Sequence, residues 1–121
     1  MVGVTGGIAA YKAAPLIRLF SEAGHNVQVV ATNNAFKFIG KTTLEALSGN
    51  PISIVDPDLF TDVDQVKHIA LAKSADLVVV APATASFLAK MTTGIADDLL
   101  TTTVLAATCP VIVAPAMHTE M

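Results

Sequence analysis

Four short apolar runs stand out along the chain, and they read as continuous strands with no regular alternation of apolar and polar residues. They occupy residues 1–4 ("MVGV"), 27–31 ("VQVVA"), 77–81 ("LVVVA") and 111–114 ("VIVA"). Continuous apolar strands are typical of a parallel sheet that is covered on both faces. We therefore predict four buried parallel strands, and residues 52–55 are a weaker candidate for an edge strand.

Segments with the apolar spacing of helices separate these runs. They predict helices over residues 9–23, 42–48, 66–74, 86–92 and 97–108, with Gly24 and Gly49 as the stops of the first two. Strands that alternate with helices, joined by right-handed crossovers, are typical of an α/β fold. The sequence thus predicts one domain with a three-layer, Rossmann-like (flavodoxin-like) architecture, in which helices cover both faces of a parallel sheet.

The loops that follow the predicted strands are polar or rich in small residues. They are residues 5–7 ("TGG"), 32–36 ("TNNAF"), 82–87 ("PATASF") and 115–121 ("PAMHTEM"), and residues 56–67 approach His68 from the same direction. In open parallel sheets, ligands bind beyond the carboxyl ends of the strands. We expect the functional site at that edge.

Composition narrows the class of protein. The chain is 53% hydrophobic, 14% charged and has a net charge of −3. It has no apolar run long enough to span a bilayer, so the apolar excess indicates a doubly covered sheet and an oligomer interface, not a membrane protein. The lack of a basic cluster argues against nucleic acid as a partner. Cys109 is the single cysteine, which excludes an internal disulfide and a cysteine-based zinc site and fits a reduced, cytoplasmic setting.

The segment "GVTGGIAAYK" has the features of a phosphate-binding turn. Gly6 and Gly7 would let backbone N–H groups approach a ligand closely, and the N-terminus of the helix that follows favours an anion. The segment is not GxGxxG, and Thr32 and two asparagines stand where a dinucleotide-binding fold would place an acidic residue. This favours a mononucleotide phosphate over NAD, although a tight turn without a ligand would use the same residues.

Several other residues have both a functional and a structural interpretation. His68 has an ordinary pKa of about 6.5 and would suit a general base, but a lone histidine is also compatible with a structural role. The segments "APATASF" and "APAMHTEM" leave room for a flat ligand beside Ala-Pro-Ala, and simple strand termination explains the prolines equally well. Asp97 and Asp98 are explained by helix capping and not by a metal site. Cys109 fits an inert buried thiol.

Taken together and in order, these segments resemble the flavin-dependent cysteine decarboxylase family. The resemblance runs over the whole chain and rests on "GVTGGIAAYK", "VKHIALAKSADLVVVAPAT", "GIADDLLTTTVLA" and "PAMHTEM". The family includes the phosphopantothenoylcysteine decarboxylases of coenzyme A biosynthesis, which in bacteria form part of a bifunctional protein, and the decarboxylases of lantibiotic peptides. It implies FMN as the cofactor, held between the subunits of a homotrimer, and in some members a dodecamer built from trimers.

The resemblance also implies an activity. This would be the FMN-dependent decarboxylation of 4′-phosphopantothenoylcysteine to 4′-phosphopantetheine, in which oxidation of the cysteine thiol allows the carboxylate to leave as CO2. Two alternatives remain: an FMN-binding regulatory subunit without catalysis, and a decarboxylase of the C-terminal cysteine of a peptide. The sequence implies no metal, no nucleic acid and no membrane as partners.

Site residues follow from the matched motifs. His68 matches the catalytic histidine of the family. His118 and Met121 match the motif that binds the substrate carboxylate, and His118 stands where the family pattern has Asn. The residues implied for FMN binding are Gly6, Gly7, Ile8, Thr32, Thr84, Ala85, Ser86, Phe87 and Ala116.

The family pattern extends beyond the segment that matches residues 115–121. Family members carry a further strand, a further helix and a flap over the substrate, and the flap bears a cysteine that takes part in the reaction. We therefore expect residues 1–121 to form a flavoprotein domain whose C-terminal part, including the substrate flap, lies outside this sequence.

Overall fold

Four parallel strands form one sheet in the structure, a computed structural model that describes residues 1–52 and 62–121. They are β1 (Val2–Val4), β2 (Val29–Ala31), β3 (Val78–Ala83) and β4 (Val111–Pro115). Their order across the sheet is β2-β1-β3-β4, and all described pairings are parallel. The chain leaves β1 toward β2 and then crosses back over β1 to β3. The sheet therefore has a topological switch point between β1 and β3, where such folds bind ligands.

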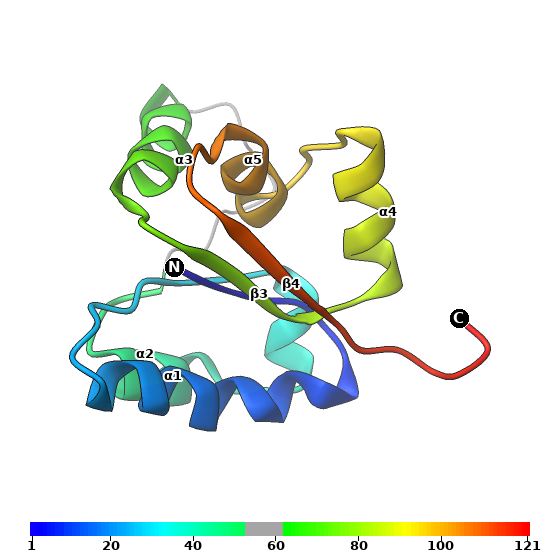
Figure 1. The fold of residues 1–121 in the computed structure, drawn as a ribbon, viewed down its shortest axis with the longest axis horizontal. Coiled ribbons are helices and arrows are strands. Elements are labelled where there is room, and N and C mark those ends of the chain that lie inside the picture. The colour runs from blue at the N-terminus through cyan, green and yellow to red at the C-terminus, as the bar shows by residue number, and fades with distance from the viewer. Residues whose placement is uncertain (53–61) are drawn as a thin grey trace.

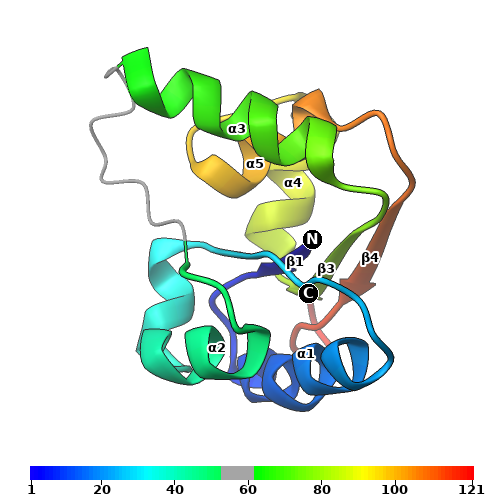
Figure 2. The same cartoon turned by 90° about the vertical axis from the view of Figure 1, so that its left-hand side faces the viewer.

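Helices cover the sheet on both faces, as Figures 1 and 2 show. On one face lie η1 (Ile8–Lys12), α1 (Ala13–Glu22), η2 (Asn33–Lys37) and α2 (Lys41–Ser48). On the other lie α3 (Asp62–Ser74), α4 (Ala85–Thr93) and α5 (Leu99–Ala106), with α5 packed against both α3 and α4. The predicted three-layer α/β fold is confirmed. In the described part of the chain, none of the helices is long and apolar enough to cross a membrane.

The apolar side chains of the strands divide between two cores. Val29 faces the core under α1 and α2, where Ile17 and Leu44 are fully buried, and the next residue, Val30, faces the opposite core. That second core contains Leu100, Phe87 and, from β3, Val78 and Val80. Because successive side chains of a strand point to opposite faces, a strand between two helical layers is apolar at every position.

The helix boundaries differ from the predicted ones in places. The predicted helix over residues 9–23 begins as the 3₁₀-helix η1 and continues as α1, and Gly24 follows its end at φ +90°. The predicted helix over residues 97–108 is shorter, because Asp98 caps the N-terminus of α5 and so lies before its first turn. The predicted loop over residues 32–36 contains η2, a 3₁₀-helix too short to produce a clear periodic pattern.

The prediction that β4 is buried on both faces is wrong for the described structure. Val111 and Ile112 are 36% and 52% exposed, and Val113 is the β4 residue that packs against the second core. The reason is position: β4 pairs with β3 on one side and forms an edge of the described sheet. A run of valine and isoleucine predicts a strand but not its place in the sheet.

The candidate edge strand at residues 52–55 lies mostly outside the described residues. Its first residue, Ile52, is buried in the first core.

Candidate functional site

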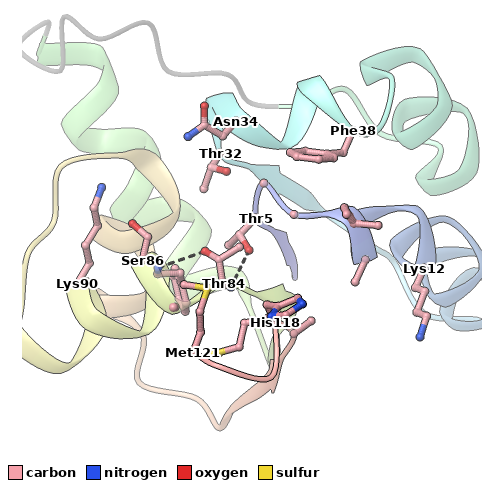
Figure 3. Close-up of a pocket in the computed structure, with 18 of the residues that line it drawn as sticks. Thr5, Lys12, Thr32, Asn34, Phe38, Thr84, Ser86, Lys90, His118 and Met121 are labelled. Atoms are coloured by element: carbon pink, nitrogen blue, oxygen red, sulfur yellow. Dashed lines mark hydrogen bonds between the residues drawn. The ribbon is translucent and has the colours of Figure 1, made fainter.

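A pocket of about 800 Å³ opens at the carboxyl edge of the sheet (Figure 3). Loops that follow all four strands line it, as predicted from the sequence, whereas residues 56–61 of the predicted approach at residues 56–67 lie outside the described residues. Figure 3 shows Thr32 and Asn34 on one side, His118 and Met121 on the opposite side, and Thr5 and Thr84 between them. Of the residues implied by the family resemblance, the pocket brings together Gly6, Gly7, Ile8, Thr32, Thr84, Ala85, Ser86, Phe87, Ala116, His118 and Met121.

Two helix starts in the pocket wall have no side-chain cap among the described residues. Gly7 is the N-cap of η1 and Thr32 is the N-cap of η2, and neither helix start is capped by a side-chain hydrogen bond. The first backbone N–H groups of a helix have no partner within the helix, and together they carry a partial positive charge. This side of the pocket is therefore suited to bind an anion such as a phosphate.

A second wall of the pocket begins with α4, whose start is capped. Thr84 Oγ1 accepts a hydrogen bond from the Phe87 N–H at 3.3 Å, and Phe87 is buried in the second core. Ala85 and Ser86 occupy the first turn of the helix between them. A small residue, Ala116, faces the same pocket, and its N–H donates to the Ala83 carbonyl at 3.0 Å. This wall therefore combines small and apolar side chains, which suit a flat aromatic ring.

Thr5 lies in the predicted loop over residues 5–7 and lines the pocket, although the sequence does not single it out as a site residue. It follows β1, and its side chain is hydrogen-bonded to the start of α4: Oγ1 donates to the Pro82 carbonyl at 2.6 Å and accepts from the Thr84 N–H at 3.0 Å. Its exposed fraction is 1%. Its signal in the sequence is a hydroxyl residue directly after a buried strand, next to the two glycines that indicate the turn.

Charged side chains of both signs reach the pocket. Lys12, Lys90 and Asp98 line it, and the uncharged Thr101 lies beside Asp98 at the start of α5. Asp98 Oδ1 accepts from the Thr101 N–H at 2.7 Å, and Thr101 completes a capping box, so the capping interpretation of Asp98 is confirmed. Within residues 1–52 and 62–121 there is no group of three or more His, Cys, Asp or Glu side chains that could hold a metal ion.

Lys90 is paired with the other carboxylate of the "DD" pair. Its Nζ donates to both Oδ1 and Oδ2 of Asp97 at 2.9 Å. The hydrogen bond with Asp97 raises the pKa of Lys90 above its ordinary value. Lys90 therefore stays charged, and its ammonium group is held at the outer end of α4.

The loop after β4 carries His118 and Met121. His118 Nδ1 is paired with the Glu120 carboxylate, and both side chains are 77% exposed. The Met121 N–H donates to the His118 carbonyl at 2.9 Å, which closes a turn. The imidazole is thus held at the open rim of the pocket, where it can meet a ligand.

His68 is the one implied site residue that the structure places elsewhere. It lies within α3, partly buried, and is not among the described residues that line the pocket. The structure of a single chain therefore does not bring this histidine to the residues implied for FMN and substrate.

Known proteins of similar sequence and structure were found for this chain. The coenzyme A biosynthesis bifunctional protein CoaBC of Mycolicibacterium smegmatis is 59% identical over 121 residues, which are all of this chain and 28% of that protein. The FMN-dependent cysteine decarboxylase SpaF has a TM-score of 0.84 and 35% identity, over 98% of this chain and 68% of that one. A PPC decarboxylase variant complexed with pantothenoylaminoethenethiol has a TM-score of 0.85 and 32% identity, over 98% and 66%.

The length of this chain is part of the comparison. It spans less than a third of the curated relatives that it matches. The model of the family described as Flavoprotein, in contrast, matches residues 1–121. This chain belongs to the flavoprotein family.

Proposed function

We propose that this chain is the FMN-binding decarboxylase part of a coenzyme A biosynthesis protein and that it converts 4′-phosphopantothenoylcysteine to 4′-phosphopantetheine. The proposal rests on one observation above all: a single pocket at the switch point gathers all the residues implied for FMN and for the substrate carboxylate. The identity to the CoaBC relatives and the likeness to the PPC decarboxylase structure support it. A cytoplasmic location goes with this role.

The shape and chemistry of the pocket fit FMN. About 800 Å³ lies within the usual range of sites for ligands of this size, roughly 300–1,000 Å³. The uncapped helix starts at Gly7 and Thr32 would hold the phosphate, with Gly6 and Ile8 beside them. The wall formed by Thr84, Ala85, Ser86, Phe87 and Ala116 would lie along the flavin ring. The phosphate and the ring would thus meet different, adjoining walls of the pocket, which suits the elongated shape of FMN.

The residues of the chain would bind and orient the substrate, while FMN supplies the two-electron redox chemistry. His118 would donate a hydrogen bond to the substrate carboxylate, and Met121 would pack against the substrate on the same loop. A protonated imidazole makes a stronger, charge-assisted bond than the Asn of the family pattern. His68 would act as the base that assists oxidation of the substrate thiol.

His68 can take that role only if a second subunit brings it to the pocket. We infer a homotrimer, in some forms assembled further into a dodecamer, in which His68 of one copy reaches the pocket of the next. Three large apolar side chains at the pocket support an interface there. Ile8, Tyr11 and Phe38 line the pocket and are 82%, 60% and 46% exposed. Exposed apolar side chains that cluster at one site are typical of protein–protein contacts.

A peptide with a C-terminal cysteine is the second candidate substrate, since the structural likeness to SpaF, an FMN-dependent cysteine decarboxylase, is as close as the likeness to PPC decarboxylase. Both substrates offer a cysteine carboxylate to His118. A third possibility, an FMN-binding regulatory subunit, would need the pocket but not His68.

The experiment starts with an absorbance spectrum of the purified protein and identification of any released yellow cofactor. We expect FMN, and we expect added FMN to bind more tightly than riboflavin because riboflavin lacks the phosphate. Release of CO2 is then compared between phosphopantothenoylcysteine and a peptide that ends in cysteine. A protein that takes up neither flavin would overturn the proposal. Binding of FMN with no CO2 from either substrate would leave the regulatory subunit.

A further inference from the structure

Thr5 lies between the wall that carries Thr32 and the wall that begins with α4. Its hydroxyl is hydrogen-bonded to Thr84 at the start of α4. We propose that Thr5 is a positioning residue of the flavin site: its hydroxyl fixes the start of α4 and so sets where the segment from Thr84 to Phe87 faces the cofactor. The inference deepens the proposed function and rests on FMN as the ligand. Thr5 lines the pocket, but it would affect the cofactor indirectly, by holding the start of α4 in place.

The Thr5 hydroxyl has a partner both as a hydrogen-bond donor and as an acceptor. Thr5 Oγ1 donates to the Pro82 carbonyl at 2.6 Å and accepts from the Thr84 N–H at 3.0 Å, while the Thr5 N–H donates to the same Pro82 carbonyl at 3.3 Å. With an exposed fraction of 1%, the side chain has almost no contact with water. A buried hydroxyl with both a donor and an acceptor role fixes two chain segments relative to each other.

The strand pairings do not supply an acceptor for the Thr84 N–H. The pairing between β1 and β3 ends with Gly3 opposite Val80, and the register between β3 and β4 shifts between Val80 and Ala83. Pro82 has no N–H to donate. Where the regular ladder stops, the Thr5 hydroxyl therefore provides the acceptor for the Thr84 N–H in place of a strand carbonyl.

Thr84 is hydrogen-bonded to the first turn of α4, so its position fixes that of the helix start. Thr84 Oγ1 accepts from the Phe87 N–H, and the Thr84 carbonyl accepts from the Leu88 N–H at 3.0 Å. On its other side, Thr84 meets the glycine turn: a methyl group at Gly7 would be 3.4 Å from Thr84 Cγ2. Thr84 is thus held between Thr5 and the phosphate-binding turn. A shift of its N–H would move the first turn of α4 relative to that turn.

A purely structural role for Thr5 makes a different prediction, and the chain offers a matched control. Thr103 is also buried, and its Oγ1 donates to the Leu99 carbonyl of its own helix at 2.6 Å. In the described structure, Thr103 does not line the pocket. Valine has nearly the shape of threonine, so at either position it removes one buried hydroxyl and changes the packing little. Only at position 5 would it disturb the flavin wall.

The test compares Thr5→Val, Thr5→Ser and Thr103→Val. For each, the dissociation constant of FMN and the visible circular dichroism of bound FMN are measured, together with urea unfolding of the FMN-free protein. Leaving the Thr84 N–H unsatisfied weakens the site. We expect Thr5→Val to bind FMN about tenfold more weakly and to change the visible spectrum. Thr5→Ser and Thr103→Val should stay within about twofold of the wild type, with unchanged spectra.

Two results would overturn the role of Thr5: a Thr5→Val protein that binds FMN as Thr103→Val does, with an unchanged spectrum, or a Thr5→Ser protein as impaired as Thr5→Val. Hydrogen exchange of the FMN-free wild type covers the case in which Thr5→Val does not fold. The Thr84 amide should exchange slowly, and exchange at the rate of an open loop would contradict the proposal. Failure of the wild type to bind FMN would instead count against the proposed function, and the exchange result would still decide on Thr5.

Discussion

Gly6 packs directly on the backbone of Asn34. A methyl group at Gly6 would stand 2.6 Å from the carbonyl carbon of Asn34 and 2.5 Å from its Cβ, closer than real Cβ contacts. The loop after β1 and the loop after β2 thus touch at this glycine. The pair that reads as a phosphate-binding "GG" has two separate tasks, because Gly6 lets the two loops meet and Gly7 starts η1 beside them.

Replacing Gly6 by alanine should displace the loop that carries Thr32. Backbone atoms cannot yield as a flexible side chain can, and overpacking of this kind typically costs about 1–3 kcal/mol. We expect Gly6→Ala to lower the free energy of unfolding by that amount and to weaken FMN binding. Gly7→Ala is the control for stability, since its nearest contact, Thr84 Cγ2, is 3.4 Å away. Urea unfolding checks this, and equal stability of the two variants would contradict the packing argument.

The adjacent carboxylates Asp97 and Asp98 should differ in their effect on stability. Asp98 caps α5 through Thr101, and loss of an N-cap typically costs about 1 kcal/mol. Asp97 forms an exposed ion pair with Lys90, and such pairs contribute about 0–1 kcal/mol. Asp98→Ala should therefore lower the melting temperature more than Asp97→Ala, while Asp98→Asn should recover most of the loss because Asn also caps helices. A reversed order would contradict the assignment.

The Lys90–Asp97 pair predicts a pH dependence at the alkaline end. The pKa of Lys90 is raised in the folded protein, mainly by its hydrogen bond with Asp97. The stabilisation is therefore complete below the ordinary lysine pKa and is lost as the pH rises through the raised value. The difference in unfolding free energy between the wild type and Asp97→Asn should be constant from about pH 7 to pH 9 and should shrink above about pH 10. A difference that persists at higher pH would show that the pair does not titrate as argued.

His68→Asn should keep FMN and lose turnover, because the side chain lies outside the pocket of its own chain. A mixing experiment tests whether it acts across subunits. His68→Asn is combined with a second inactive variant that is damaged in the pocket, such as Thr84→Pro, under conditions that allow subunits to exchange. Hybrid oligomers should regain part of the activity, since some pockets then combine an intact wall with an intact histidine. Equal activity of His68→Asn and the wild type would remove this residue from the mechanism.

His118→Asn should be tolerated, because either side chain can donate a hydrogen bond to a carboxylate. His118→Ala removes that donor and should raise KM for the substrate by about tenfold or more. An effect of this size is typical of the loss of a hydrogen bond to a charged group. FMN binding should not change in either variant. If His118→Asn loses activity with FMN still bound, the imidazole has a role that an amide cannot replace.

The layers of the fold and the location of the site were predictable because they depend on local patterns. The runs around Val29 and Val79 are apolar at successive positions, which only a doubly covered strand requires. Glycine after a helix, as at Gly24 and Gly49, marks its end through a positive φ. Once the strands are parallel, their carboxyl ends share one edge. The loops with Thr32 and Thr84 therefore had to meet.

What the tertiary structure decided depends on residues far apart in the chain. The exposure of Ile112 reflects the place of β4 at an edge of the described sheet, not its composition. The separation of His68 from the pocket follows from the path of α3, and the contacts of Gly6 with Asn34 and of Thr5 with Thr84 join segments that no periodic pattern connects. The sequence by itself determined which elements form and which loops share an edge, because hydrophobic period and chain connectivity act locally. Which atoms touch across that edge was decided by packing between the two cores.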